Sequence, residues 1–472
     1  MLRRDEGVSF RRAAAPPGFW ASQVRSAATE ETVAADWVRL GVWLYFWLVI
    51  FEGAIRKWLV PQLNAPLLLI RDPLVVFIYW QAYRASRIPL SKIMPFAGIG
   101  LAITMLAAAQ VLAGINTVPI AAYGLRSYLL HLPLIVIMAR TLKAADLRAV
   151  GRCILLLSVP MAGLMAVQFY APATSWLNSG PGDTGQMLSM GGHVRPAGTF
   201  SFGTGAQCFV ILAEAFLIYG LTNRKVYSNW VLWPAIAATA AAIPLSGSRT
   251  VLFLTVLMFA FAMVSGLASP TSLVRLLRTL LVVALVYVAV AELRVFQDAT
   301  SVLSARFQEA SNTEGGLQDV LELRVLGVFG DGITATRRED WLGQGVGMGS
   351  NVAAVLKTGS MGFLLAEMEW ARVVLEMGPI VGVCFILFRC LLCGQLVLSA
   401  MKVLMRRRYN LAWLLVPATV PLLIMTTMEQ PTNLGFMILG AGFCAAAAER
   451  RAPLRQVCLS PCLPGIAVQA RG

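Results

Sequence analysis

Two arginines lie where apolar segments of the sequence meet polar ones. Arg195 stands in HVRPAGTFSFGTGAQ, just before an apolar segment, and Arg249 ends the turn PLSGSR between two such segments. Guanidinium groups that converge suit a diphosphate, because their planar fork matches phosphate oxygens in pairs. The alternative for any one arginine is that it extends toward lipid headgroups. The positions of both arginines at segment ends favour an anion site.

A third arginine, Arg324, lies in the polar stretch LQDVLELRVLGVF (317–329). Apolar residues recur there at the spacing of an amphipathic helix, with acidic residues on the other side. At roughly 100° per residue, Arg324 falls on the apolar side, whereas a surface helix normally keeps arginine on its wet face. We therefore predict that Arg324 points back into the membrane body, toward Arg195 and Arg249.

Charged residues also interrupt the apolar segments. FEGAIRKWLVP brings Glu52, Arg56 and Lys57 to the end of the first segment, and the next segment carries Arg71 and Asp72. A charge at membrane depth is costly, so each needs a partner or a function. We predict internal neutralisation that joins the two segments; contact with an anion or a sugar is the alternative. The same two interpretations apply to two further acids, Glu214 and Glu429.

The stretch WLGQGVGMGSN (341–351) is rich in glycine without being a nucleotide-binding loop. It lacks the GxGxxG spacing, the Walker lysine and a preceding buried strand. Glycine permits positive φ angles and lets two backbones come close together. We therefore predict a tight turn with close backbone approach.

The composition identifies the elements that must position these residues. The chain has 472 residues, of which 58% are hydrophobic and 13% charged, with a mean hydropathy of +0.70. Ordinary soluble domains carry roughly 25% charged residues, so a water-soluble enzyme, a secreted disulfide scaffold and a disordered chain are excluded. The net charge of +15 suits the basic cytoplasmic loops of a membrane protein. Without a nucleic-acid-binding motif, it does not indicate a nucleic-acid partner.

A membrane-spanning helix needs about 20 largely apolar residues. Twelve candidate segments meet or approach this length, near residues 39–55, 66–83, 94–114, 119–139, 153–171, 204–221, 229–246, 250–268, 279–293, 370–398, 411–428 and 433–448. The second and fourth are interrupted by charge, and the ninth is short. The sequence thus predicts an all-α integral membrane protein with about 12 transmembrane helices.

The direction of the helices follows from the distribution of lysine and arginine. Basic residues collect in alternate connections and near both ends of the chain, which places these parts in the cytoplasm. Both termini are then inside, and two long connections lie outside, where loops often carry function. The predicted organisation is a cytosolic tail (1–36), nine helices (37–293) with an outer loop (172–203), a large periplasmic loop (294–369), three helices (370–448) and a second cytosolic tail (449–472).

Three stretches resemble the bacterial O-antigen polymerase and O-antigen ligase superfamily. They are SGSR at an outer helix start, ELRVLGVFGDGITATRREDWLGQGVGMGSN (322–351) and EMEWARVVLEMGPIVG (367–382). The resemblance covers residues 195–382. FEGAIRKW and IRDP in the N-terminal part are similar to exopolysaccharide polymerases of the same superfamily.

The resemblance implies a metal-independent membrane glycosyltransferase of the GT-C type that uses no cofactor. Its donor would be an oligosaccharide on undecaprenyl diphosphate, presented at the periplasmic face of the bacterial inner membrane. Arg195, Arg249 and Arg324 match the arginine positions of the family. They would hold the diphosphate leaving group and stabilise the charge that develops on it.

One departure from the family pattern concerns the base. The ligases usually have a histidine near residues 367–370, where this chain reads Glu-Met-Glu-Trp. Glu369 and His193 are the two candidates for a base that helps the acceptor hydroxyl attack. The other histidine, His131, lies in an apolar segment and is predicted to be a packing residue. The missing ligase histidine favours the polymerase branch.

The leading hypothesis is therefore a polysaccharide polymerase that joins lipid-linked repeat units of an O-antigen or exopolysaccharide. The alternative within this class is a ligase that transfers polymer to a lipid or other acceptor. A polysaccharide transporter or flippase is the alternative from another class, and the membrane-depth charges speak for it. Expected partners are the lipid-linked oligosaccharide, the bilayer, and polysaccharide chain-length and export proteins.

Overall fold

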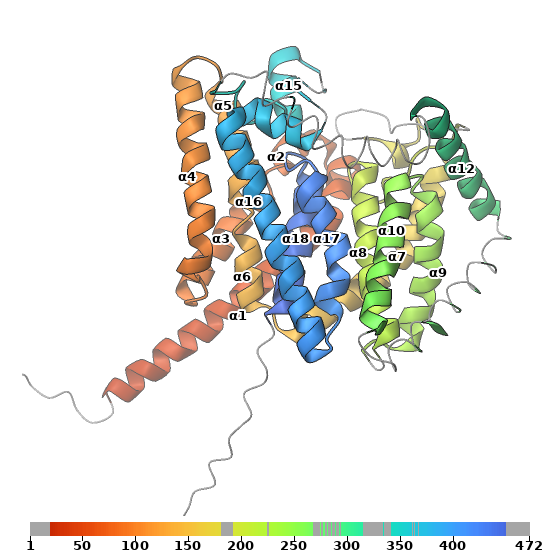
Figure 1. Ribbon diagram of the computed structural model, residues 1–472, viewed down its shortest axis with the longest axis horizontal. Coiled ribbons are helices and arrows are strands. Elements are labelled where there is room, and N and C mark those ends of the chain that lie inside the picture. Colours follow the sequence, from red (N-terminus) through yellow and green to blue (C-terminus); the bar gives the residue numbers. More distant parts are fainter. Residues whose placement is uncertain are drawn as a thin grey trace, which may run out of the picture.

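The chain folds into helices joined by turns and short loops (Figure 1). The computed structural model describes residues 19–180, 192–223, 226–267, 294–314 and 341–449 except 361, 363 and 367, together with single positions between 274 and 292 and Thr334. Within these residues there is no β-strand. The expected all-helical fold is confirmed for this part of the chain.

The described part of the chain contains nineteen helical elements. They are α1 (Phe19–Ala54), η1 (Ile55–Leu59), η2 (Pro61–Leu63), α2 (Asn64–Leu67), α3 (Arg71–Arg84), α4 (Leu90–Leu112), α5 (Val118–Leu125), η3 (Arg126–Leu130), α6 (Leu134–Thr141), α7 (Ala144–Tyr170), η4 (Trp176–Asn178), α8 (Gly203–Thr222), α9 (Asn229–Leu245), α10 (Arg249–Leu267), α12 (Arg294–Glu314), α15 (Asn351–Thr358), α16 (Glu369–Arg407), α17 (Leu411–Met425) and α18 (Pro431–Ala448).

Eight helical segments among the described residues are long and apolar enough to cross a membrane. They are Glu31–Leu59, Leu90–Leu112, Val118–Thr141, Ala144–Tyr170, Gly203–Thr222, Arg249–Leu267, Glu369–Arg407 and Pro431–Ala448. Helices α9 and α17 are apolar but shorter. These segments are those of a multi-pass membrane protein.

Two of the twelve predicted spans are not among these ten helices. The segment 66–83 is broken, because α2 ends at Leu67 and the 14-residue helix α3 begins only at the buried Arg71. The segment 279–293 lies outside the described residues, apart from single positions. The number of twelve spans therefore stays a prediction.

Helix α18 forms the centre of the bundle. It packs against α6, α8, α16 and α17, and nearly all of its residues are buried. Small residues allow this close packing: a Cβ atom on Gly440 would lie 2.8 Å from Oγ1 of Thr419 in α17. Such residues are typical of helix contacts in membranes, where backbones must approach closely for dispersion forces to act.

Helix α16 is bent near its start. Gly378 has φ 71° and ψ 168°, which are not the dihedral angles of an α-helix. Pro379 follows it. Proline cannot donate the hydrogen bond that would continue the helix through this point. The bend separates a short first part, which ends at Met377, from the long second part of α16.

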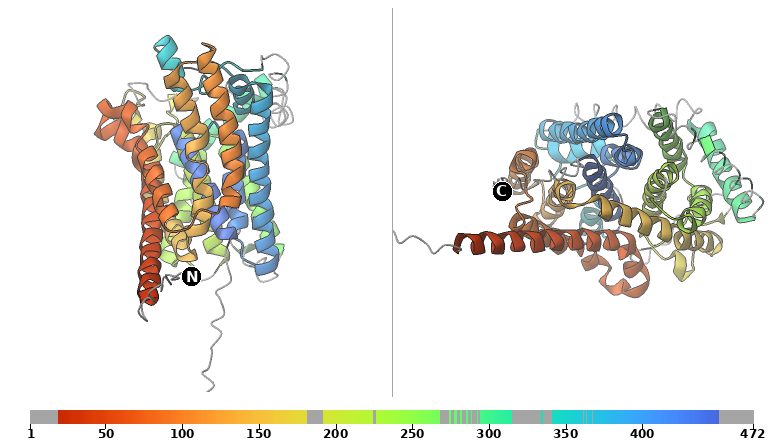
Figure 2. Two further views of the ribbon diagram at one scale, coloured as in Figure 1. Left: turned by 90° about the vertical axis from the view of Figure 1, so that its left-hand side faces the viewer. Right: turned by 90° about the horizontal axis from the view of Figure 1, so that it is seen from below.

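The long helices stand side by side (Figures 1 and 2). Two ion pairs lie at one end of the bundle. There Arg39 lies 2.5 Å from Asp146, joining α1 to the start of α7, and Lys92 pairs with Glu449. We name this the inner end, because it gathers connections that the sequence places in the cytoplasm. The opposite end, which carries α15, is the outer end. Its position outside the cell stays a prediction.

Thiol labelling tests this orientation. We introduce cysteine at Thr250 at the start of α10 and, separately, at Arg407 at the end of α16, in a chain without native cysteines. A membrane-impermeant reagent should label position 250 in right-side-out vesicles and position 407 only in inverted ones, because arginine-rich connections stay in the cytoplasm. Labelling of both positions from the same side would contradict the proposed topology.

Candidate functional site

Two of the predicted arginines belong to segments that contact the first turns of α8. The Arg195 side chain lies against Gly203, where a Cβ atom would be 3.6 Å from Cγ of the arginine. Ser248, which precedes Arg249, donates a hydrogen bond of 3.1 Å to Oε1 of Gln207. Gly203 and Gln207 are four residues apart and therefore share one face of α8. Arg195 and Arg249 thus both adjoin the first turn of this helix.

The first turn of α8 presents hydrogen-bond donors. Its N-cap residue, Phe202, makes no side-chain capping bond. A helix N-terminus carries a partial positive charge and amides that favour an anion. Oγ1 of Thr204 and Nε2 of Gln207 are buried and have no hydrogen-bond partner among the described residues. Such donors beside Arg195 make this turn a candidate phosphate site.

The loop that carries Arg195 is fixed to the helices on both sides. Gly198 accepts hydrogen bonds of 3.1 Å from Lys57 and of 3.1 Å from Gln168, and its amide donates to Gln168 at 2.7 Å. Thr199 donates to the carbonyl oxygen of Ile50 at 2.7 Å. These bonds tie the loop to α7 and to the outer end of α1, so that Arg195 is held by a rigid support.

Arg324, the third arginine of the predicted site, and the amphipathic helix around it lie outside the described residues. The expected convergence of the three arginines therefore stays a prediction.

His193, a candidate base, lies at the outer end of α7. Its ring stacks on Phe169, with centroids 4.2 Å apart and an angle of 7° between the planes. Its Nδ1 atom is 3.3 Å from the carbonyl oxygen of Phe169. Only Val194 separates it from Arg195 in the chain. His193 is thus oriented by its stacking partner close to one of the arginines.

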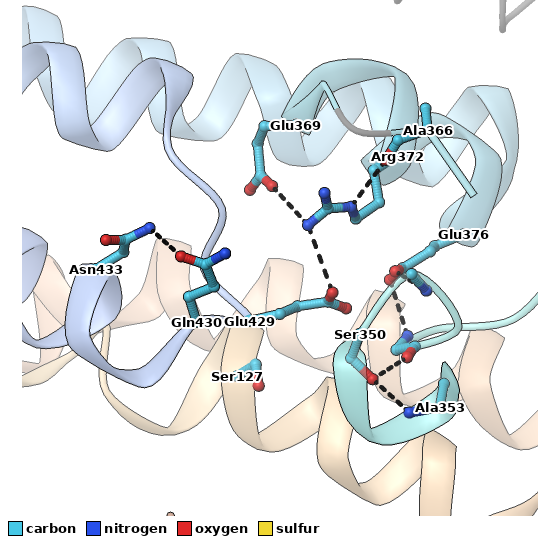
Figure 3. Close-up of polar contacts among 12 residues, drawn as sticks. Ser127, Ser350, Ala353, Ala366, Glu369, Arg372, Glu376, Glu429, Gln430 and Asn433 are labelled. Carbon is cyan, nitrogen blue, oxygen red and sulfur yellow. Dashed lines mark hydrogen bonds and ion pairs between the residues drawn. The ribbon is translucent and has the colours of Figure 1, made fainter. Parts of the chain in front are cut away.

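Glu369, the other candidate base, lies in a buried ion pair. Its carboxylate is 2.6 Å from Arg389, which also donates to the carbonyl oxygen of Leu423 at 2.8 Å. On the other side Arg372 lies 3.9 Å away (Figure 3). Glu369 therefore joins the two parts of α16 across the bend, and Arg389 joins the second part to α17. The role of Glu369 as a base stays a prediction.

Glu376 is an acid that the sequence analysis did not single out. Its carboxylate accepts hydrogen bonds from the amides of Gly347 at 2.8 Å and Gly349 at 2.7 Å, and from the hydroxyl of Tyr128 at 3.0 Å. Glu429 approaches it from the loop between α17 and α18 and pairs with Arg372 at 3.6 Å (Figure 3). The predicted structural pairing of Glu429 is confirmed. We name five residues the buried charge cluster: Glu369, Arg372, Glu376, Arg389 and Glu429.

The glycine-rich stretch 341–350 forms the predicted tight turn. Gly343, Gly345 and Gly347 all have positive φ angles, of 67°, 124° and 85°. A Cβ atom on Gly347 would lie 2.5 Å from the carbonyl oxygen of Ile120. Besides Glu376, Gln110 and Asn116 hold the turn by hydrogen bonds to Val346. This glycine turn is packed against the bend in α16.

The predicted neutralisation at the ends of the first two spans is confirmed for Glu52. Glu52 lies 2.8 Å from Arg71 and 3.4 Å from Arg56, which joins α1 to α3. Asp72 instead finds its partner in η3, where Nε of Arg126 lies 2.7 Å away. It also contacts Nε2 of His131 at 3.1 Å, so this buried histidine is part of a polar network as well as of the packing.

Glu214, the remaining membrane-depth acid, accepts a hydrogen bond of 2.7 Å from Thr255. This contact joins the middle of α8 to α10. The interpretation of Glu214 as a residue with a structural contact agrees with this position.

No protein-family model matches the sequence, and no curated protein matches it.

Alanine substitution of Gly347 tests the close approach at the glycine turn. Gly114 is the control, since its φ of 74° is similar but nothing lies within 4 Å of its Cβ position. Gly114→Ala should cost about 1–2 kcal/mol through its positive φ alone. Gly347→Ala should cost about 1–3 kcal/mol more, because the methyl group meets backbone. Equal melting temperatures of both variants in detergent would contradict this packing.

Removal of Arg389 tests the ion pair with Glu369. Arg389→Met should lower the free energy of unfolding by about 3–5 kcal/mol, because it leaves a buried carboxylate short of one partner. Adding Glu369→Gln should restore part of this loss. As a control, Lys92→Met removes an exposed ion pair with Glu449 and should cost about 0–1 kcal/mol. If both single variants melt alike, Arg389 does not stabilise Glu369.

Proposed function

We propose that the chain is a polysaccharide polymerase of the bacterial inner membrane. It joins oligosaccharide units linked to undecaprenyl diphosphate at the periplasmic face. The observation that carries this proposal is the placement of Arg195 and Arg249 beside the uncapped first turn of α8. Together with the resemblance of 195–382 to O-antigen polymerases and ligases, it favours a diphosphate as the group bound there.

The diphosphate lies between the two guanidinium groups in this proposal. The amides of the first turn of α8 and the side chains of Thr204 and Gln207 donate further hydrogen bonds to it. Helix α8 is apolar and long enough to cross a membrane. A site at its first turn would then lie at the membrane surface, where the headgroup of a lipid-linked donor lies. The bilayer itself holds the polyprenyl chain.

The reaction transfers the sugar from diphosphate to a hydroxyl group. The hydroxyl oxygen attacks the anomeric carbon while the bond from this carbon to the diphosphate oxygen breaks. Arg195 and Arg249, with Arg324 as the expected third, stabilise the negative charge that the leaving diphosphate gains. His193 accepts the proton of the attacking hydroxyl more readily than Glu369, whose carboxylate is engaged by Arg389.

Two alternatives predict different products from the same site. A ligase would transfer the polymer to a lipid or other acceptor. A transporter or flippase would move the lipid-linked saccharide, and the buried charges at membrane depth, such as Glu52 with Arg71, favour this alternative. Polysaccharide chain-length and export proteins are the expected partners of a polymerase.

One assay distinguishes the three activities. Purified protein in liposomes receives labelled undecaprenyl-diphosphate oligosaccharide on the outer face. A ladder of longer saccharides supports the polymerase, and label on a lipid acceptor such as lipid A-core supports the ligase. Movement of the label across the bilayer without a new glycosidic bond indicates a transporter and would overturn the proposal.

Arginine substitutions test the diphosphate site. Arg195→Ala, Arg249→Ala and Arg324→Ala should each reduce polymer formation about 100-fold or more, because each removes charge stabilisation of the leaving group. Arg152→Ala is the control, since this arginine lies over Trp230 on α9 and away from the outer turn. Protein levels in the membrane should not change. Polymer of normal length and amount from the Arg195 and Arg249 variants would remove the role assigned to them.

A further inference from the structure

The buried charge cluster contains more acid than base. Its five side chains are each at most 5% exposed, and they comprise three carboxyl groups and two guanidinium groups. If all five were ionised, one negative charge would remain without a partner within the cluster, as far as the described residues show. An unbalanced charge in a dry interior is costly, and a carboxyl group avoids this cost by keeping a proton.

Two of the three carboxyl groups have the surroundings of ionised groups. Glu369 lies between Arg389 at 2.6 Å and Arg372 at 3.9 Å. Glu376 accepts three hydrogen bonds, two from backbone amides and one from Tyr128. Since an ionised carboxylate only accepts hydrogen bonds, three donors on two oxygens fit this form of Glu376.

Glu429 remains as the group that holds the proton. Both oxygens of its carboxyl group are buried and have no hydrogen-bond partner among the described residues. The carboxyl group of Glu376 is a neighbour, and a hydrogen bond between two carboxyl groups requires that one of them is protonated. Burial raises the pKa of Glu429 well above its ordinary range, and the neighbouring charge of Glu376 raises the pKa further. Arg372 acts in the opposite direction, at 3.6 Å.

We propose that Glu429 is a proton-binding site and that its proton stabilises the packing at the outer end of the bundle. The bound proton holds the loop between α17 and α18 against Glu376, and so against the glycine turn. When the proton leaves, two carboxylates face each other and the loop separates from α16. This proposal concerns the protein itself and does not depend on the reaction assigned to it.

The residues that follow Glu429 contact α3 and the first turn of α8. Pro431, two residues after Glu429, accepts a hydrogen bond of 2.5 Å from Arg71. Thr432 packs on α8, where a Cβ atom on Gly205 would lie 2.7 Å from its Cγ2 atom. Movement of this loop would therefore disturb the turn beside Arg195 and Arg249. The proton thus stabilises the arrangement of the candidate anion site.

Other titratable groups surround Glu429 from each neighbouring element. α16 contributes Glu369, Arg372 and Glu376, α5 contributes Tyr123, which donates to the Glu429 carbonyl oxygen at 3.1 Å, and η3 contributes Tyr128. Beyond Tyr123, Arg56 and Arg126 face the carboxylates of Glu52 and Asp72. These arginines are engaged by their own partners, which leaves Glu429 as the group that changes charge.

The sign of the pH dependence follows from the raised pKa. Stability from the protonated Glu429 is complete below the ordinary pKa of a carboxyl group. It persists as pH rises and is lost as pH passes through the raised pKa. An alkaline decline in stability is therefore expected for the native protein.

Thermal unfolding of the full-length protein in detergent, from about pH 5 to about pH 9, tests this sign. The melting temperature of the native protein should fall toward alkaline pH. That of Glu429→Gln should fall less, because glutamine donates a hydrogen bond to Glu376 and cannot ionise. Glu449→Gln at the inner end is the matched control and should retain the decline. A decline of the same size in Glu429→Gln would overturn the proposal.

Hydrogen exchange of the native protein gives a second test, which does not require any variant to fold. After correction for the intrinsic effect of pH, the amides of Gly347 and Gly349 should lose protection about tenfold per pH unit above the pKa of Glu429. Amides in the middle of α7 should keep theirs. Uniform protection of the glycine turn across this range would overturn the proposal, whatever the activity assay shows.

Discussion

The structure of the outer end depends on the neutralisation of buried charge. Charged side chains within an apolar bundle are stable only with partners, since water is not available to solvate them. Some of these contacts also join different elements. Glu52 with Arg71 joins α1 to α3, and Glu369 with Arg389 and its carbonyl contact joins α16 to α17. The charges thereby determine how the helix ends are arranged.

The glycine turn shows how one of these charges organises a loop. Glu376 binds two amides of the turn, and the bend at Gly378 brings its carboxylate to them. The turn must be compact to fit against α5, and Gly347 permits this because it carries no side chain. A single carboxylate thus holds together the bend in α16, the turn and Tyr128.

The candidate anion site is built on the same principle of rigid support. α8 is among the most deeply buried helices, and its first turn points to the outer end of the bundle. Arg195 is carried by a loop bonded to Lys57 and Gln168, and Arg249 begins a helix whose preceding serine bonds to α8. Two guanidinium groups on fixed supports can bind a diphosphate without losing much conformational freedom.

Much of the fold follows from local properties of the sequence. Helix length and hydropathy depend on neighbouring residues, so most of the apolar spans could be located from composition alone. The glycine turn was predictable because positive φ angles and close approach are properties of glycine itself. The breaks at Arg71 and around 55–70 were less visible, because there a long apolar run is divided by charges whose partners lie elsewhere.

The sequence by itself determined that the chain is helical and apolar, that Glu52 would need a neighbouring cation, that Arg195 precedes a helix and that Arg249 lies at a helix end. Only the tertiary structure decided which groups meet. Asp72 pairs with Arg126, Glu369 with Arg389, and Glu376 with the amides of the glycine turn. The physical reason is that such pairs depend on how helices rotate and pack against one another, which no local pattern of residues specifies.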